Sequence, residues 1–216
     1  MPAMEAWAVV VAGGNGSRFG RPKQFEQLAG RSLIEWSLDA ARDACAGVVL
    51  VLPAERATDS GPWDVDAVVA GGATRSASVR AGLAAVPPAA TVIAVHDAAR
   101  PLARVDLWKA VIEAVGAGAD AAIPAAAVTD TVKEVGEGGH LVTLDRSRLV
   151  AVQTPQAFRA DILRLVHRSG GEATDDAALV EEAGGRVQLV EGPRDNIKIT
   201  CPEDLLVARA LLEGSR

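Results

Sequence analysis

The segment from Val9 to Gln24, VVVAGGNGSRFGRPKQ, constrains the fold more than any other part of the chain. The apolar run 7–12 is typical of a strand that is buried on both faces of a parallel sheet. Glycines at positions 13, 14, 16 and 20 follow it, and there backbone N–H groups can approach a ligand with no Cβ in the way. Arg18, Arg21 and Lys23 add positive charge to the same loop. The segment therefore predicts a strand that opens into an anion-binding loop suited to a triphosphate.

Two better-known phosphate-binding loops do not match this segment. A Walker loop needs G-x-x-x-x-G-K-[ST], and no lysine here follows a glycine in that way. A dinucleotide fingerprint needs G-x-G-x-x-G, but Phe19 occupies the third glycine position, and Gly20 gives only the looser G-x-G-x-x-x-G of some dehydrogenases. Neither motif requires Arg and Lys inside the loop. The plain structural alternative is a glycine-rich turn whose charges are solvated.

Composition limits the class of protein. The 216 residues suit one domain over residues 1–216, and the hydrophobic content of 49% is that of a soluble globular protein. The net charge of −6 argues against binding to nucleic acid or to an anionic membrane. Cys45 and Cys201 form no CxxC pair, so neither a disulfide framework nor a zinc site is expected. The first residues do not resemble a signal peptide, which predicts a cytoplasmic protein.

Strand-like and helix-like segments alternate along the chain. This order predicts a Rossmann-like, doubly wound α/β fold with a mostly parallel sheet, whose ligands bind beyond the carboxyl ends of the strands. The expected strands are 7–12, 48–53, 67–70, 91–96, 120–124, 187–191 and 196–200. The expected helices are 32–45, 75–86, 105–117, 161–168, 175–182 and 203–212.

Residues 128–144 break this alternation. Thr, Val and Leu alternate with polar residues on both sides of Gly136-Glu137-Gly138-Gly139, which predicts a β-hairpin. An isolated hairpin is marginally stable in water, so we expect an arm over about residues 127–146 that packs against a partner chain as a dimerisation arm. A hairpin folded back on its own domain is the alternative.

Further polar clusters follow the expected strands. In His96-Asp97-Ala98-Ala99-Arg100-Pro101 a carboxylate could hold magnesium or a hydroxyl and a guanidinium could bind phosphate, or Asp97 and Arg100 could simply pair across the turn. His96 itself is expected to be packed and hydrogen-bonded rather than a base. A second glycine loop precedes Thr74 and Ser76, either of which could be the N-cap of the next helix, and Gly72 and Ser78 could read a base or a ribose.

Two later clusters complete the set. Lys198 lies between Ile197 and Ile199, so its side chain is expected on the opposite face, where it would meet an anion. Thr174-Asp175-Asp176 is interpreted as a helix N-terminus with favourable acidic charge.

Taken together, these motifs resemble a known family. The order and spacing of AGGNGSRFGRPKQ, GGATRSASVRAGL, HDAARP, TDTVK, QTPQAF, TDDAALVE and NIKITCPEDL are similar to those of 2-C-methyl-D-erythritol 4-phosphate cytidylyltransferases, over roughly residues 7–212. The resemblance implies transfer of CMP from CTP to a polyol phosphate, with release of pyrophosphate, in non-mevalonate isoprenoid synthesis. It also implies a homodimer whose hairpin arms complete the partner's site.

The resemblance assigns roles residue by residue. By this match, the catalytic residues are Arg18, Lys23, Arg146 and Lys198: the first two stabilise the transition state, and the last two position the polyol phosphate. Other substrate contacts are Asp97, Arg100, Thr131 and Thr154. The contacts to the nucleotide are Ala12, Gly13, Gly14, Gly16, Gly72, Ser78 and Ala98.

The same chemistry follows from the charges. An acidic protein can bring two phosphorylated molecules together only by concentrating cations locally, and Mg²⁺, bound mainly through the phosphates of CTP, would supply the remainder. The attacking phosphate is already ionised near neutral pH, so no general base is needed. Three alternatives remain open: a ribitol 5-phosphate cytidylyltransferase, an NADP-dependent reductase, and a non-catalytic nucleotide-binding module. The reductase would need a Tyr or Lys near the hydride, and the chain has no tyrosine.

Overall fold

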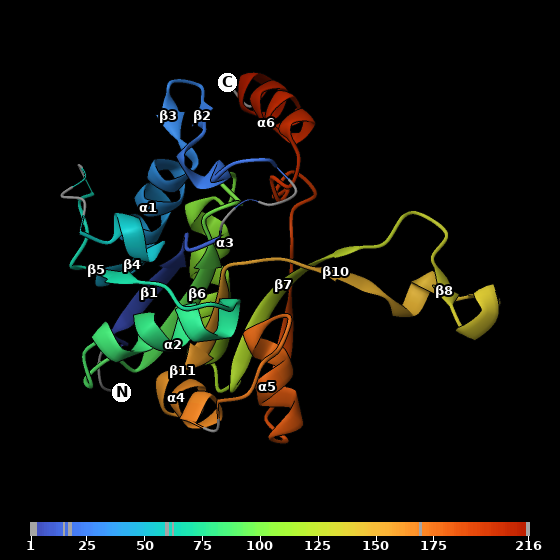
Figure 1. Ribbon diagram of the computed structural model, residues 1–216. Coiled ribbons are helices and arrows are strands. Elements are labelled where there is room, and N and C mark those ends of the chain that lie inside the picture. Colours follow the sequence, from blue (N-terminus) through green and yellow to red (C-terminus); the bar gives the residue numbers. More distant parts are fainter. Residues whose placement is uncertain are drawn as a thin grey trace.

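The centre of the molecule is an eight-stranded sheet (Figure 1), seen in a computed structural model that describes residues 4–14, 16, 19–58, 61, 63–168 and 170–214. Its strands within these ranges are β1 (Ala6–Val11), β4 (Gly47–Leu52), β5 (Ala67–Ala70), β6 (Val92–Asp97), β7 (Ala121–Ala127), β10 (Val150–Val152), β11 (Gln156–Arg159) and β12 (Val187–Glu191).

The sheet is mostly parallel, as the alternation of segments predicted. Strands β5, β4, β1 and β6 lie side by side in parallel, and β7 and β12 form a further parallel pair. Between β6 and β7 lies β11, antiparallel to both, and β10 continues the antiparallel pairing along β7. The carboxyl ends of β1, β4, β5 and β6 therefore meet at one edge of the sheet, where ligands of such folds bind.

Helices cover both faces of the sheet. The helix α1 (Leu33–Ala44) and α3 (Val105–Gly116) pack on one face, whereas α2 (Arg75–Ala85), α4 (Ala160–Arg168) and α5 (Asp176–Glu182) pack on the other. Strand β1 shows why: Ala8 and Val10 belong to the first hydrophobic cluster and Val9 to the second, because alternate side chains of a strand point to opposite faces. Within the described ranges no helix has the length and apolar character needed to cross a membrane.

The helix α6 (Pro202–Gly214) belongs to neither layer. It packs against a small hairpin of β2 (Gln27–Leu28) and β3 (Arg31–Ser32), beside which it lies in Figure 1, in a third cluster that includes Leu28, Ile199 and Ala208. All three side chains are fully buried. This cluster holds the segment that follows the first glycine loop, around Leu28, and the segment around Ile199.

The predicted strand at 196–200 is wrong. These residues form no ladder with the sheet, and their long-range backbone hydrogen bond runs from the Ile199 N–H to the Ala99 carbonyl, at 2.8 Å. The alternation of apolar residues has another cause, because Ile197 and Ile199 pack into the third hydrophobic cluster. The segment crosses the end of the sheet instead of joining it.

Other differences are smaller. The short strands β10 and β11 were not predicted, because segments of three and four residues on either side of a Gln-Thr-Pro sequence carry too little periodicity to stand out. The remaining strands and all six predicted helices lie within a few residues of their expected bounds.

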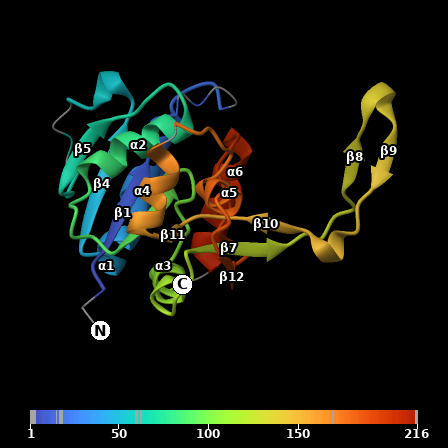
Figure 2. The same ribbon diagram turned by 90° about the horizontal axis from the view of Figure 1, so that it is seen from below.

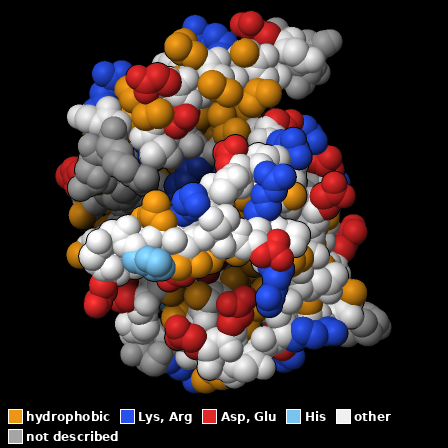
Figure 3. Space-filling view, turned by 90° about the vertical axis from the view of Figure 1, so that its right-hand side faces the viewer, with side chains coloured by type: hydrophobic (Ala, Val, Ile, Leu, Met, Phe, Trp, Pro, Cys, Tyr) orange, Lys and Arg blue, Asp and Glu red, His pale blue; other side chains and the backbone are white. Residues whose placement is uncertain are grey.

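The predicted hairpin forms and projects away from the sheet (Figures 1 and 2), so the alternative of a hairpin folded back on its own domain is wrong. Strand β8 (Lys133–Val135) pairs with β9 (Leu141–Thr143), and all six residues are exposed. Gly138 and Gly139, with φ of 69° and 80°, make the turn. Figure 3, which faces the side to which the arm projects, shows hydrophobic side chains between charged ones; Val135, Leu141 and Val142 are exposed on the arm.

Candidate active site

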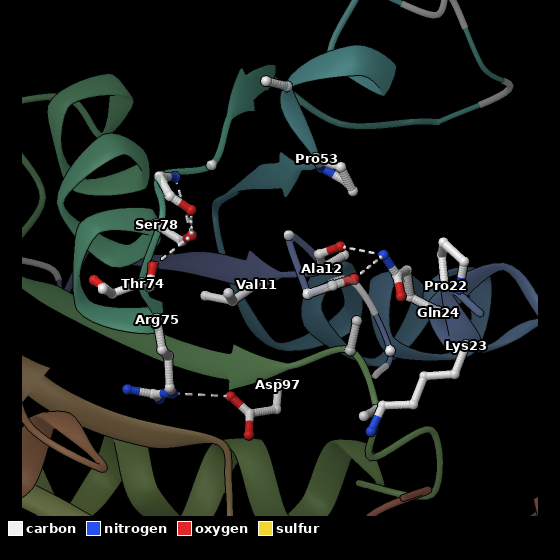
Figure 4. A pocket seen from close by; sticks show the side chains of 18 of the residues that line it. Val11, Ala12, Pro22, Lys23, Gln24, Pro53, Thr74, Arg75, Ser78 and Asp97 are labelled. Atoms are coloured by element: carbon white, nitrogen blue, oxygen red, sulfur yellow. Dashed lines mark hydrogen bonds and ion pairs between the residues drawn. The ribbon is translucent and has the colours of Figure 1, made fainter. Parts of the chain in front are cut away.

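A pocket of about 700 Å³ opens at the carboxyl ends of β1, β4, β5 and β6 (Figure 4). Ten predicted site residues line it, from the end of β6, from segments that follow these strands, from the first turns of α2 and from the segment after β12: Ala12, Gly13, Gly14, Gly16, Lys23, Gly72, Ser78, Asp97, Ala98 and Lys198. Arg18, the remaining cation predicted in the first loop, lies outside the described residues.

The first glycine loop is closed on itself at Gly16. This residue has φ of +67°, and a Cβ there would lie 1.8 Å from the Arg21 carbonyl oxygen, so no other residue type fits. The Gly16 carbonyl accepts hydrogen bonds from the N–H groups of Phe19 and Gly20, at 2.8 and 2.9 Å. After this turn comes the short 3₁₀ helix Lys23–Phe25, and its first residue, Lys23, lines the pocket.

The second glycine loop is held by the start of α2. Of the two candidates for the N-cap, Thr74 caps this helix, because its hydroxyl accepts the N–H of Ala77 at 3.0 Å. The buried Ser78 hydroxyl donates to the Thr74 carbonyl at 3.0 Å and accepts the Gly72 N–H at 3.2 Å. Ser78 therefore shapes the loop from behind, and its hydroxyl already has protein partners.

Asp97, the last residue of β6, lies between two cations. Its Oδ1 accepts from Arg75 Nε at 3.2 Å, and its Oδ2 accepts from Lys198 Nζ at 2.6 Å. Burial would raise the pKa of the Asp97 carboxyl, but the charges of Arg75 and Lys198 outweigh burial and hold that pKa well below its usual range. Asp97 is thus a carboxylate, and the predicted alternative of an Asp97–Arg100 ion pair is wrong.

Arg75 is a pocket residue that the sequence analysis did not assign. Its guanidinium points toward Asp97 in Figure 4, and its Nη1 donates to Asp176 Oδ2 at 2.8 Å. Asp176 is 1% exposed and also bonds to His167 Nε2 through Oδ1, at 2.9 Å. Hydrogen bonds therefore join residues from four elements in one network that ends at the pocket. The available signal was an arginine directly after a capped helix start beside two glycines.

The neighbouring residues Asp175 and Asp176 have different roles. The cluster is a helix N-terminus, as predicted, and Asp175 caps α5 by accepting the N–H of Ala178 at 3.0 Å. Asp176, the first residue of the helix, is instead the buried partner of Arg75 and His167.

Arg100 and Thr154 lie behind the pocket instead of lining it. Arg100 donates to the carbonyls of Asn196 and Val152, at 2.8 and 3.2 Å. The buried Thr154 hydroxyl accepts the Asp97 N–H at 3.1 Å. In this arrangement both residues support the segments that carry Asp97 and Lys198.

Thr131 and Arg146 lie at the base of the arm, where both are exposed, and neither lines the pocket. The Arg146 guanidinium donates to the Thr129 carbonyl. Of the four predicted catalytic cations, Lys23 and Lys198 line the same pocket of one chain, whereas Arg146 lies on the arm.

His96 is buried and hydrogen-bonded, as expected. Its ring packs against Trp108 with 5.0 Å between ring centroids, and its Nδ1 lies 3.0 Å from the Thr154 hydroxyl. Because that hydroxyl accepts the Asp97 N–H, its own hydrogen is available to Nδ1 of a neutral imidazole. Burial lowers the pKa of His96 to about 3, so the ring is neutral at physiological pH.

The described residues offer a divalent cation few ligands. They contain no cluster of three or more His, Cys, Asp or Glu side chains placed to hold a metal, and the carboxylates at the pocket are Glu55 and Asp97. Mg²⁺ commonly takes one or two carboxylates and completes its shell with water and substrate phosphates. These residues suit a cation that enters with a polyphosphate.

Comparison with known proteins gives one consistent result. The family model for 2-C-methyl-D-erythritol 4-phosphate cytidylyltransferase matches residues 6–214. A relative of that name from Rubrobacter xylanophilus is 45% identical over 96% of this chain and 94% of its own length. The crystal structure of a 2-C-methyl-D-erythritol 4-phosphate cytidylyltransferase from Thermus thermophilus is 39% identical, with a TM-score of 0.80 over 95% of this chain and 98% of that chain. A 4-diphosphocytidyl-2C-methyl-D-erythritol synthase from Anaerococcus prevotii gives a TM-score of 0.84 at 28% identity, over 97% and 98%.

The depressed pKa of His96 predicts a loss of stability in acid. In the unfolded chain the imidazole takes a proton near pH 6.5, whereas the folded protein resists protonation down to about pH 3. The contribution of the neutral imidazole to the free energy of unfolding is complete above pH 6.5 and is lost as the pH falls from 6.5 to about 3. When the pH falls from 7.5 to 5.0, we therefore expect the free energy of unfolding of the parent protein to drop by about 2 kcal/mol more than that of His96→Gln.

Urea unfolding at the two pH values measures this difference. His140→Gln is the matched control, because His140 is exposed in the turn of the arm. A pH dependence in His96→Gln equal to that of the parent would contradict the prediction.

Proposed function

The chain belongs to the 2-C-methyl-D-erythritol 4-phosphate cytidylyltransferase family, and from that membership we propose how its residues carry out the reaction. It is a nucleotidyltransferase that transfers CMP from CTP to 2-C-methyl-D-erythritol 4-phosphate in isoprenoid precursor synthesis. The resemblance found in the sequence is thereby confirmed. The comparisons do not favour a ribitol 5-phosphate enzyme, a reductase or a non-catalytic module. A cytoplasmic location stays a prediction.

The chemistry is a displacement at phosphorus. A phosphate oxygen of the polyol phosphate attacks the α-phosphorus of CTP, a new P–O bond forms, and the bond to the bridging oxygen of the β-phosphate breaks to release pyrophosphate. A phosphate monoester loses its second proton near pH 6, so the nucleophile needs no base at neutral pH. The protein contributes positioning and charge stabilisation. His96 agrees with this mechanism, because it does not line the pocket and its pKa of about 3 makes it too weak a base to take a proton there.

Lys23 and Lys198 are the described cations that best fit the catalytic role. They come from segments 175 positions apart in the chain and line the same pocket, and this juxtaposition is the observation on which the assignment rests. Lys198 has 38% of its side chain exposed and is oriented by the carboxylate of Asp97. Its ammonium can therefore meet a phosphate from a fixed direction. For Arg18 the family resemblance alone supports a role.

Mg²⁺ is proposed to enter with CTP. When bound, it would neutralise charge on the triphosphate and polarise its oxygens. Asp97 is the residue at the pocket that would hold it, together with phosphate oxygens. Arg75, which keeps its contact with Asp176, would continue to balance the charge of Asp97 if Lys198 turned toward a phosphate.

The two glycine loops are proposed to bind the nucleotide. The loop of Gly13, Gly14 and Gly16 supplies backbone N–H groups to the triphosphate, and the loop at Gly72 borders the opposite wall. Ser78 acts on this wall through its hydrogen bonds to Gly72 and Thr74.

The arm is proposed to form a homodimer and to complete the partner's site. Its exposed hydrophobic residues Val135, Leu141 and Val142 need a surface to cover them, and the two-stranded hairpin has no core of its own. Thr131 and Arg146 sit away from their own pocket. A two-fold dimer would let them act on the partner's polyol phosphate.

Pyrophosphate release with a panel of substrates tests the reaction. We expect activity with CTP and 2-C-methyl-D-erythritol 4-phosphate, and little with ATP, GTP or UTP. Ribitol 5-phosphate as acceptor is the competing assay. Activity with ribitol 5-phosphate alone would refute the proposed acceptor.

Removal of Lys23 tests transition-state stabilisation. Lys23→Ala is expected to lower kcat by about 10²–10³-fold, the usual effect of removing one donor that stabilises developing charge. Lys109→Ala is the control, since Lys109 is exposed on α3. Retained turnover in a folded Lys23→Ala protein would support a nucleotide-binding module instead.

Mixed dimers test whether the arm acts across the interface. Lys198→Ala disables a pocket and keeps its arm, whereas Arg146→Ala disables an arm and keeps its pocket. After unfolding and refolding in a mixture, about half of the dimers carry one of each, and one of their two sites is intact. We expect recovery to about one quarter of the parent activity.

Lys23→Ala mixed with Lys198→Ala is the control, because neither chain of that mixture has an intact pocket. An Arg146→Ala mixture no more active than this control would show that the arm serves its own chain.

A further inference from the structure

Gln24 joins the first glycine loop to the segment that carries Lys23. Its side chain is 4% exposed, and its Nε2 donates to the carbonyl oxygens of Ala12 and Gly14, both at 2.8 Å. Figure 4 shows the two hydrogen bonds leaving the same amide nitrogen. Both hydrogens of that nitrogen are therefore used, and both are used on backbone atoms of the loop.

These bonds decide which polar groups the loop presents to the pocket. In a planar trans peptide, the carbonyl of one residue and the N–H of the next point in opposite directions. With the Ala12 carbonyl turned toward Gln24, the Gly13 N–H points away from Gln24. A carbonyl oxygen directed into the pocket would repel a triphosphate, so holding the carbonyls back favours an anion.

Other side chains do not replace this arrangement. Glutamate has oxygens where the two hydrogens are needed and would face two carbonyls, whereas methionine has a similar length and no hydrogen to donate. Asparagine is shorter by one methylene. Because Gln24 follows Lys23 directly, the same contact also fixes the position of that lysine relative to the loop.

We propose that Gln24 is a positioning residue that holds the first glycine loop in its anion-binding form before CTP binds. The inference rests on the proposed function, since it assigns the loop to the triphosphate of CTP. Gln24 also lines the pocket, but both hydrogens of its amide nitrogen are used on the backbone of Ala12 and Gly14, and it acts through these two residues.

Steady-state kinetics of Gln24→Glu and Gln24→Met test this inference. At pH 8 we expect the KM for CTP to rise about 10–100-fold in both variants, which is the effect of leaving buried carbonyls without a donor. The KM for the polyol phosphate is expected to change less than about twofold, because its proposed contacts do not involve this loop. The thermal midpoint without ligand shows that each variant is folded.

The pH gives a second readout that simple loss of packing would not produce. As the pH falls, the carboxyl group introduced by Gln24→Glu takes up a proton and gains one hydrogen to donate. The CTP affinity of this variant should therefore partly recover relative to the parent. Gln24→Met should show no such recovery. Gln27→Glu is the matched control, since Gln27 is exposed three residues away, and its kinetics should equal those of the parent.

The possible outcomes separate this inference from the proposed function. If the parent protein neither binds CTP nor releases pyrophosphate from it, the proposed function fails. If the parent is active and folded Gln24→Met and Gln24→Glu retain its KM for CTP, the role of Gln24 alone is refuted. Equal increases in the KM of both substrates would likewise refute it, because they indicate a general structural defect.

Discussion

The contact of Asp97 with Arg75 and Lys198 is the interaction around which the pocket is built. A carboxylate at the end of a buried strand would repel two phosphorylated substrates if it stood alone. Arg75 offsets its charge and is itself held by Asp176, a residue that is 1% exposed. Removing one partner of such a buried pair is costly, because it leaves the other charge without compensation. Asp97 can therefore orient Lys198 without making the pocket anionic.

This arrangement explains how an acidic chain binds anions. The net charge of −6 describes the whole surface, whereas the potential within a recess depends on the few charges that line it. Lys23 and Lys198 come from opposite ends of the chain and meet only because the strand ends converge. The fold thus concentrates positive charge locally, and the backbone N–H groups of the first glycine loop add to it.

Much of the fold could be predicted because its signals are local. The apolar run of β1, the Thr74 cap and the amphipathic helices follow from period and side-chain chemistry within a few residues. The segment 196–200 misled the prediction because Ile197 and Ile199 alternate for packing, with no strand beside them. Strand β11 was missed for the opposite reason: it is short, and its place between β6 and β7 depends on partners about 60 and 35 residues away.

The site was predicted in part for the same reason. Gly13, Gly14 and Lys23 could be assigned because they share one motif, whereas Lys198 was noted from its place between two isoleucines and received its role from the family resemblance. Arg75 and Gln24 were not assigned, since their importance lies in contacts with Asp176 and with backbone carbonyls that no spacing reveals. Arg100 shows a further limit: its position after β6 suggested a ligand contact, yet its hydrogen bonds go to Val152 and Asn196.

That pair of hydrogen bonds links two parts of the molecule with different tasks. Val152 ends the strand by which the chain returns from the projecting hairpin, and Asn196 lies two residues before Lys198. Gln153 and Asn196 bond to each other as well, at 3.0 Å. The Arg100 guanidinium and the Gln153–Asn196 pair thus join the strand that returns from the hairpin to the backbone beside the lysine. The hairpin and the pocket lysine are therefore tied to the same set of hydrogen bonds, so that a displacement of the return strand would also displace the backbone beside Lys198.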